Sequence, residues 1–93
     1  MASTDFREVG IGRAENGDGA MIEPMARELM FYTRPGFELP IETYFVEGKA
    51  VVYQPKTMPS PLPPGMTPED IFAEIRAGVA VANGMCEVEW KVG

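Results

Sequence analysis

The sequence contains no histidine, an absence that excludes most familiar catalytic and metal-binding arrangements. Histidine is the commonest general base near neutral pH and the commonest zinc ligand, and it activates serine and cysteine nucleophiles. Only carboxylate chemistry stays open, and sequence spacing alone does not bring Glu69, Asp70 or Glu74 together, so we interpret them as solvated surface groups. We therefore predict that the protein is not an enzyme and binds no metal or cofactor.

Cysteine is nearly absent as well, since Cys86 is the only one. A single cysteine cannot form an intramolecular disulfide, which is typical of a reducing compartment. Its place in an alternating run predicts a buried apolar side chain rather than a nucleophile. Residues 1–6 lack the basic and apolar regions of a secretory signal, and no apolar run is long enough to span a membrane. We expect a cytoplasmic protein.

Basic residues are few: 8 lysines and arginines stand against 14 acidic residues, for a net charge of −6. They are scattered singly between Arg7 and Lys91. Binding to a phosphate backbone needs clustered lysine and arginine, because counterion release provides the affinity. We therefore expect neither direct nucleic-acid binding nor binding to an anionic membrane, and the charge favours solubility.

Three short motifs resemble binding signatures but lack an essential part. The stretch from Gly10 to Glu15 begins like a dinucleotide-binding loop, but a carboxylate stands where the third glycine belongs. Residues 15–19 offer calcium-friendly oxygens without the ligand spacing or the distal glutamate of an EF-hand loop. Residues 61–64 fit the PxxP pattern without a flanking basic residue, so we interpret them as a structural connector.

The residues that are present predict one folded domain. The 93 residues are too few for two domains, and 45% of them are hydrophobic, close to the globular average. We assign residues 1–93 to a single domain, and we expect part of residues 1–19, which are rich in glycine and polar side chains, to be mobile. Residues 55–67 are a proline-rich connector, because proline cannot donate to a hydrogen-bond ladder.

The clearest predicted element is a β-hairpin over residues 41–54. Two runs rich in β-branched and aromatic residues flank a two-residue turn that contains a glycine. A turn of this length pairs Val46 with Lys49 and Tyr44 with Val51, and it places alternate residues on opposite faces of the hairpin.

A helix is predicted over residues 68–82, with Thr67 as its N-cap and Pro68 as its first residue. Gly78 inside this helix costs about 1 kcal/mol relative to alanine. An alternative therefore ends the helix at the glycine and makes residues 79–82 a strand, followed by a hairpin turn.

Two further segments complete the predicted fold. Residues 20–34 show both helical spacing and alternation, and we favour a strand over a helix. Residues 85–92 alternate clearly and predict a final strand that places Val88 and Trp90 in the core. Together these elements predict an α+β fold, in which the C-terminal helix crosses a small antiparallel sheet of three to five strands centred on the hairpin.

The predicted hairpin is apolar on both faces, which is the one feature that indicates a binding surface. A sheet face turned to water should be polar, yet the second face carries Tyr44, Val46, Val51 and Tyr53, with Glu42 at its edge. Either the domain covers both faces or one face meets another chain. Aromatic residues edged by charges are typical of an interface, so these five residues form the candidate site.

The candidate site predicts a small acidic protein-binding module, such as an inhibitor, adaptor or accessory factor, whose partner is another protein or a second copy of the chain. The alternative is a structural subunit of a homo-oligomer, a virion or another assembly, with the hairpin paired between chains. A small-ligand binder is a weaker alternative. A monomeric mass favours the module, and a dimer or closed ring favours the subunit.

Overall fold

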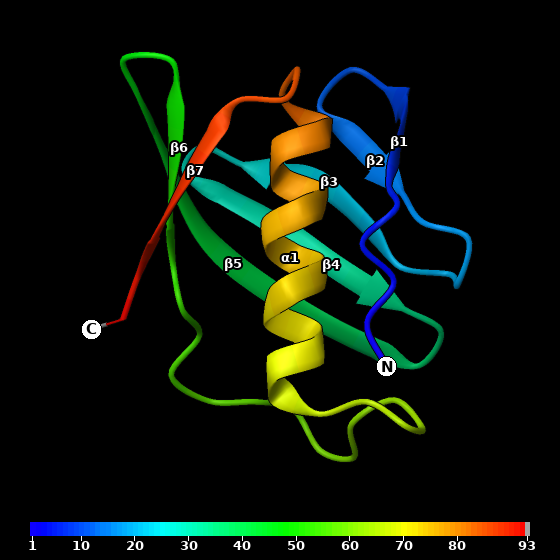
Figure 1. Cartoon of the computed structure of the whole chain (residues 1–93). Coiled ribbons are helices and arrows are strands. Elements are labelled where there is room, and N and C mark those ends of the chain that lie inside the picture. The colour runs from blue at the N-terminus through cyan, green and yellow to red at the C-terminus, as the bar shows by residue number, and fades with distance from the viewer. Residues whose placement is uncertain (93) are drawn as a thin grey trace.

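Seven strands and one helix make up the structure, a computed structural model that describes residues 1–92. The strands lie in one sheet in the same order as in the sequence (Figure 1). Strands β1 to β6 are successively antiparallel, whereas β7 runs parallel to β6 because α1 connects the two. The elements are β1 (Arg7–Gly10), β2 (Arg13–Glu15), β3 (Met21–Ala26), β4 (Leu29–Arg34), β5 (Phe37–Val46), β6 (Lys49–Tyr53), α1 (Pro68–Ala82) and β7 (Glu87–Lys91).

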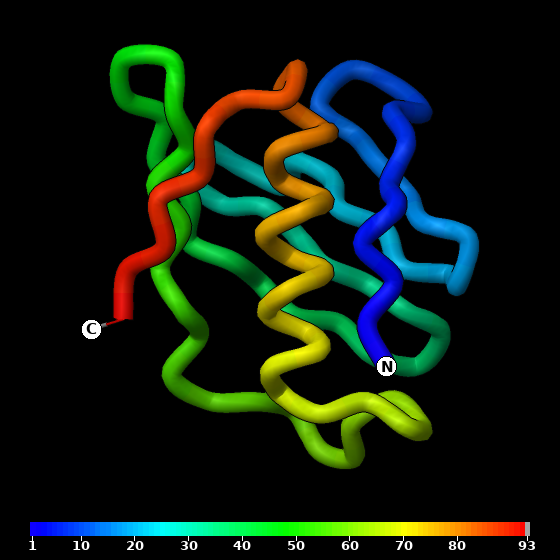
Figure 2. The backbone as a smooth tube through the Cα atoms, viewed as in Figure 1, coloured from blue at the N-terminus to red at the C-terminus, as the bar shows by residue number. Residues whose placement is uncertain are grey.

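The prediction of a small antiparallel sheet with three to five strands is wrong, because the sheet is mixed and has seven strands. It curves into a half-barrel that holds the helix in its hollow (Figures 1 and 2). The additional strands come from the N-terminal third of the chain. Residues 1–19, for which we expect some mobility, contain β1 and β2, which have four and three residues and are too short to show a clear alternation.

The segment 20–34 forms a hairpin of two strands, β3 and β4, rather than one strand or a helix. Its turn was not predicted because Glu28 takes a positive φ of 62°, a conformation that glycine or asparagine normally marks in a sequence. Pro24 lies within β3, next to a shift in the register between Pro24 and Ala26. This shift accommodates a residue that cannot donate to the ladder.

The predicted β5–β6 hairpin is confirmed in its register and is longer than expected on its first strand. Val46 pairs with Lys49 and Tyr44 pairs with Val51. The two turn residues, Glu47 and Gly48, have φ of 50° and 82°. Positive φ at both central residues matches the right-handed twist of the two strands, which fixes the register.

The helix α1 occupies the predicted residues and continues through residues 79–82, so the alternative strand there is wrong. The Thr67 Oγ1 accepts a hydrogen bond from the Asp70 amide at 3.2 Å, and an Asp70 carboxylate oxygen accepts one from the Thr67 amide at 3.0 Å. This reciprocal capping box satisfies backbone donors that the first turn leaves unpaired. The helix ends at Asn83 and Gly84, where the glycine takes a φ of 73°.

Gly78 lets the helix approach the sheet closely. A Cβ atom at this position would lie 2.5 Å from the Ile22 Cγ1 and 3.0 Å from the Phe6 Cε2. Both distances are shorter than an ordinary van der Waals contact, so no other residue fits without a shift of the neighbouring side chains. The helix therefore keeps a residue of poor helical propensity because the packing requires it.

The core lies between the helix and the concave face of the sheet. The helix contributes Ile71, Ile75 and Val79, which are fully buried. Side chains from β2 to β6 close the core on the other side, together with Phe6, and they include Ala14, Ile22, Met30, Tyr32, Phe37, Leu39, Ile41, Ala50 and Val52. The proline-rich connector crosses one end of the half-barrel between β6 and α1 (Figure 2), and its Met58 and Leu62 pack against this core.

One carboxylate, Glu74, is fully buried on the inner face of α1, which corrects the prediction that it is a solvated surface group. It accepts hydrogen bonds from the Tyr32 hydroxyl at 2.6 Å, from the Arg34 Nη2 at 2.7 Å and from the Ser3 amide at 2.8 Å. A buried charge is tolerated when it is paired and its lone pairs are used. The group therefore joins α1, β4 and the N-terminal segment.

The final strand is β7, and its Trp90 and Val88 are half-buried rather than fully in the core. The indole contacts Phe72 at a ring separation of 5.6 Å, and its Nε1 donates to the Gln54 Oε1 at 3.0 Å. The Arg76 guanidinium lies over the ring, 4.9 Å from its centre. The burial is partial because β7 is the last strand of the sheet.

Candidate functional site

The β5–β6 hairpin turns one face toward α1 and the opposite face outward. Buried and exposed positions alternate along β5, and Ile41 and Thr43 point into the core. Tyr44 and its even-numbered neighbours therefore lie on the outer face, which the single helix of residues 1–92 does not cover. We use "outer face" for this side of β4 to β7. The structure brings the predicted residues together there: Glu42, Tyr44, Val46, Val51 and Tyr53.

The five predicted residues differ in their accessibility. Tyr53 and Val46 are exposed, with 39% and 46% of their surfaces accessible, and Tyr44 is half-buried. Val51 lies on the outer face outside the core cluster, but only 9% of its surface is accessible because its neighbours cover it. Val51 therefore packs beneath the more exposed side chains of the outer face, and little of its own surface is accessible to a partner.

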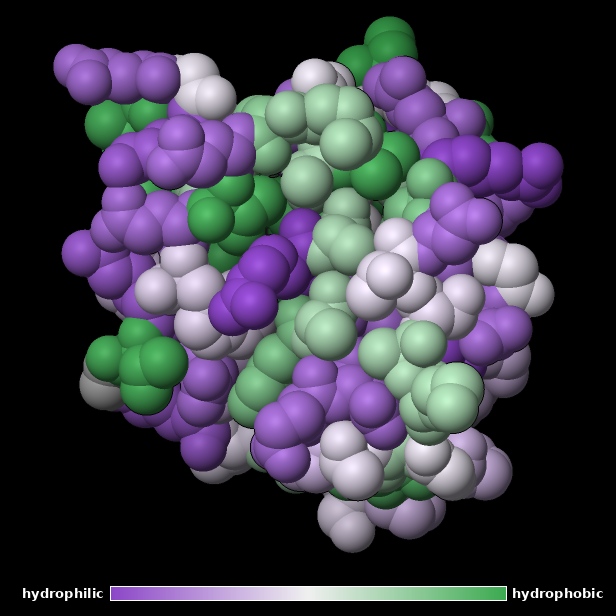
Figure 3. All heavy atoms as spheres, in the orientation of Figure 1, coloured by the Kyte–Doolittle hydropathy of each residue, from purple (hydrophilic) through white to green (hydrophobic). Residues whose placement is uncertain are grey.

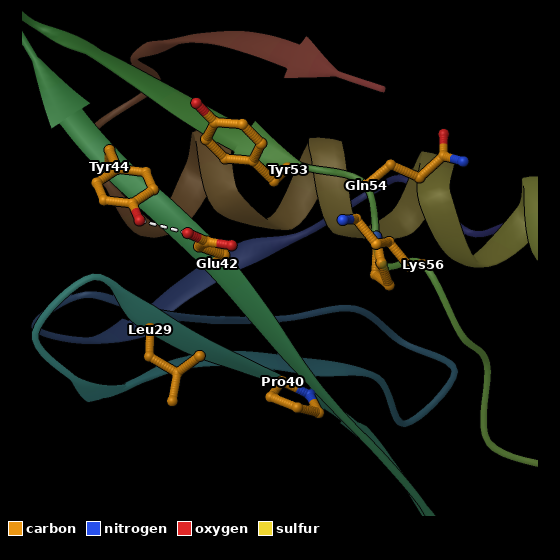
Figure 4. A pocket seen from close by; sticks show the side chains of 8 residues that line it. Leu29, Pro40, Glu42, Tyr44, Tyr53, Gln54 and Lys56 are labelled. Carbon is orange, nitrogen blue, oxygen red and sulfur yellow. Dashed lines mark hydrogen bonds between the residues drawn. The ribbon is translucent and has the colours of Figure 1, made fainter. Parts of the chain in front are cut away.

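The two tyrosines form a pair at the centre of the outer face. Their rings are 5.6 Å apart at an interplanar angle of 83°, the edge-to-face geometry that aromatic side chains prefer. Tyr44 lies opposite Val51 in the ladder, so Tyr53 is its diagonal neighbour on the adjacent strand. The Tyr44 hydroxyl donates a hydrogen bond to the Glu42 carboxylate, as the dashed line in Figure 4 shows.

This hydrogen bond, followed by desolvation and the nearby charges of Glu42 and Glu28, raises the pKa of Tyr44 to about 12. The phenol therefore keeps its proton at neutral pH, and it stays a donor to the carboxylate. The Glu42 carboxylate accepts this hydrogen bond, so one end of the outer face carries an acidic side chain beside an aromatic ring.

A cleft opens beside the tyrosines because β5 changes its partner along its length. Residues Phe37–Glu42 pair with β4, and residues Thr43–Val46 pair with β6. Within residues 1–92, β6 pairs with β5 only from Thr43 to Val46, and a cleft of about 670 Å³ lies beside the part of that edge before Thr43. Figure 4 shows it between β5 and the chain that leaves β6. The lining residues are Leu29, Pro40, Glu42, Tyr44, Tyr53, Gln54, Pro55 and Lys56.

A second hollow of about 430 Å³ lies on the other side of the tyrosine pair, between Val46 and β7. Its charged rim is a group of three side chains. The Lys49 and Lys91 amines lie 2.5 Å and 3.0 Å from the two carboxylate oxygens of Glu89. Hydrogen bonds from the two lysines lower the pKa of Glu89 to about 2. The tyrosine pair thus separates an acidic end of the outer face from an end that carries two lysines.

Sequence reasoning found the tyrosines but missed the cleft residues Leu29, Pro40, Gln54 and Lys56. Leu29 comes from β4 and lies opposite Glu42, a pairing that requires the β3–β4 hairpin to be recognised first. Pro40 was the one residue whose type could have indicated the cleft, because a proline within a strand is typical of an unpaired edge.

Comparison with protein families, with curated proteins and with solved structures found no match. No helix within residues 1–92 is long and apolar enough to cross a membrane. Within the same residues no three histidine, cysteine or acidic side chains are grouped so that they could hold a metal ion. The side chains of the outer face offer aromatic and apolar contact, hydrogen bonding and charge pairing.

A groove of about 470 Å³ lies on the opposite side of the molecule, where α1 faces outward. Small apolar side chains gather along this side between charged groups (Figure 3). The half-buried Cys86 lines it together with Val88 and three alanines of α1. This groove presents neither an aromatic ring nor an acidic side chain, so the outer face of the hairpin is the stronger candidate.

Proposed function

We propose that the chain is a non-enzymatic protein-binding module, an inhibitor, adaptor or accessory factor, that binds a partner polypeptide through the outer face of β5 and β6. The observation that carries the proposal is the pair of the half-buried Tyr44 and the exposed Tyr53, which lies between two hollows. Tyrosine is enriched at protein interfaces, because its ring buries a large area while its hydroxyl stays hydrogen-bonded.

The partner in this proposal is a protein, since a net charge of −6 without clustered lysines disfavours a nucleic acid or an anionic membrane. The compartment in this proposal is the cytoplasm, because the single cysteine, Cys86, suits a reducing environment. The proposal includes no chemical step. A truncated tyrosine should therefore change the affinity for the partner and no reaction rate.

A photo-reactive phenylalanine derivative at position 53 tests the proposal in cells that produce the protein. We expect a discrete cross-linked species heavier than the monomer, because the ring at this position lies against the partner. The matched control carries the same group at position 69, where the exposed Glu69 lies on α1. Cross-linking at neither position, or equally at both, would contradict the proposal, and a species of twice the chain mass would favour a self-associating subunit.

A further inference from the structure

We propose that the cleft beside Tyr44 and Tyr53 binds an extended, proline-containing segment of the partner protein that carries a basic side chain. This inference rests on the proposed function and adds the chemistry of the bound segment. It depends on three observations about the cleft: the backbone donors that its walls lack, the side chains that replace them, and the charge at its acidic end.

The cleft follows the edge of β5 that faces away from β4. The Thr43 amide donates to the carbonyl of Glu28, the turn residue just before β4, and backbone groups alternate in direction along a strand. The amides of Leu39 and Ile41 therefore also face β4, whereas Glu38, Pro40 and Glu42 face the open edge. Within residues 1–92, no strand pairs with this edge of β5 between Phe37 and Glu42.

Proline removes donors from both walls of the cleft. Pro40 has no N–H at the middle of the open edge, and Pro55 has none on the opposite wall. A β-strand added here would leave some of its own carbonyls unpaired, which is unfavourable. A polyproline II segment has no such requirement, since it makes no ladder and its backbone is satisfied by scattered donors.

Side chains supply these scattered donors and an aromatic wall. Lys56 and Tyr53 carry donors at the cleft, whereas the Gln54 side chain points away from it and accepts from the Trp90 Nε1 (Figure 4). The rings of the tyrosine pair form one wall, and Leu29 and Pro40 add apolar surface. Aromatic-lined grooves that offer side-chain donors are a recognised way to bind proline-rich segments.

The charge at the β5 side of the cleft favours a basic side chain on the bound segment. Glu42 lines the cleft, Glu38 lies two positions before Pro40 on the same exposed face, and Glu28 is close enough to act on Tyr44 electrostatically. These three carboxylates outnumber the one basic side chain that lines the cleft, Lys56. One carboxylate oxygen of Glu42 accepts from Tyr44, and the second oxygen remains for the ligand. An arginine there would form a charge-assisted hydrogen bond.

A second copy of the chain fits this site less well than an extended segment does. The outer face is the convex side of a half-barrel (Figure 2), so two copies placed face to face would touch over a small area. The net charge of −6 on each copy also opposes their association. The cleft of about 670 Å³ between β5 and the chain that leaves β6 instead offers room for one extended segment.

An NMR titration with a defined probe tests this inference. The probe is an acetylated, amidated oligoproline peptide with one central arginine. We expect saturable amide shifts at Glu42, Gln54 and Lys56. Tyr44→Ala should weaken binding about tenfold or more, because a central aromatic anchor is lost. Phe45→Ala is the matched control. Phe45 is exposed and follows Tyr44 on the same strand, so its side chain lies on the opposite face, and its loss should leave the affinity unchanged.

Two further probes identify the chemistry. The same peptide with a central glutamate should bind less tightly than the arginine peptide, and Glu42→Gln should remove that preference while Glu47→Gln retains it. An alternating valine–threonine peptide with one arginine should bind more weakly than the oligoproline peptide. Absence of saturable shifts, shifts confined to the α1 groove, or tighter binding of the valine–threonine peptide would overturn the inference. The proposed function would survive any of these results if the cross-link at position 53 persisted.

Discussion

At the residue scale, Gly78 sets how closely α1 packs on the sheet. Gly78→Ala improves helical propensity by about 1 kcal/mol, yet its new methyl group would lie 2.5 Å from the Ile22 Cγ1. We expect the clash to dominate, so that the variant is destabilised by about 1–3 kcal/mol. Chemical denaturation measures this change in the free energy of unfolding.

The adjacent position provides the control for Gly78→Ala. Ala77→Gly, on the half-buried side of the same helix, should cost only about 1 kcal/mol through propensity. If Gly78→Ala proved as stable as the parent, the close approach between helix and sheet would be wrong.

The Tyr44–Glu42 hydrogen bond gives a prediction about pH. The pKa of Tyr44 is raised to about 12 from 10.0, so the native state holds this proton more tightly than the unfolded chain does. Its contribution to stability is complete below pH 10 and disappears as the pH rises through 12. Tyrosine-resolved NMR titration should show Glu42→Gln moving this pKa back toward 10.0. An unchanged pKa in that variant would contradict the hydrogen bond.

The buried carboxylate of Glu74 predicts a larger effect on stability. Glu74→Gln retains the size of the side chain but leaves Arg34, whose side chain is 11% accessible, without its charge partner. Breaking such a buried pair costs about 3–5 kcal/mol. Urea denaturation compares this variant with Glu69→Gln, an exposed change on the same helix that should stay within about 0.5 kcal/mol of the parent. Equal stabilities would show that the ion pair contributes nothing.

At the element scale, the capping box defines where α1 begins. Thr67→Ala removes the acceptor of the Asp70 amide and should cost about 1 kcal/mol of stability. Thermal unfolding by circular dichroism measures it, with Thr57→Ala in the connector as a control that caps no helix. A melting temperature equal to that of the parent would mean that the Thr67 hydroxyl does not stabilise the first turn.

Elements with strong local signals could be predicted, and those that depend on tertiary packing could not. The helix has a good cap, and the β5–β6 turn contains a glycine, so both are visible in the sequence. The β3–β4 hairpin was missed because Glu28 occupies a turn position without a turn-forming residue. The burial of Glu74 was missed because its partners, Tyr32 and Arg34, are about forty positions away in the sequence.

At the scale of the whole molecule, curvature gives the sheet two different faces. The helix fills the concave side, and the convex side keeps the apolar and aromatic residues that the sequence places on the second face of the hairpin. Alternation along the strands predicted which residues share that face. The cleft could not be predicted, because it depends on β5 pairing with β4 along its first part and with β6 along its second part. The sequence of the hairpin indicates only the second of these pairings.

The most direct test of the outer face as an interface is the melting temperature of the Tyr44→Ala, Tyr53→Ala double variant. Accessible residues contribute little to their own fold, so the loss should be limited to the edge-to-face contact, about 0.5–1.5 kcal/mol. That corresponds to a decrease of less than about 12 °C in a domain of this size. Val51→Ala provides a reference for a covered position on the same face. A double variant that is largely unfolded at 25 °C would show that the tyrosines hold the fold together and would contradict their role in binding.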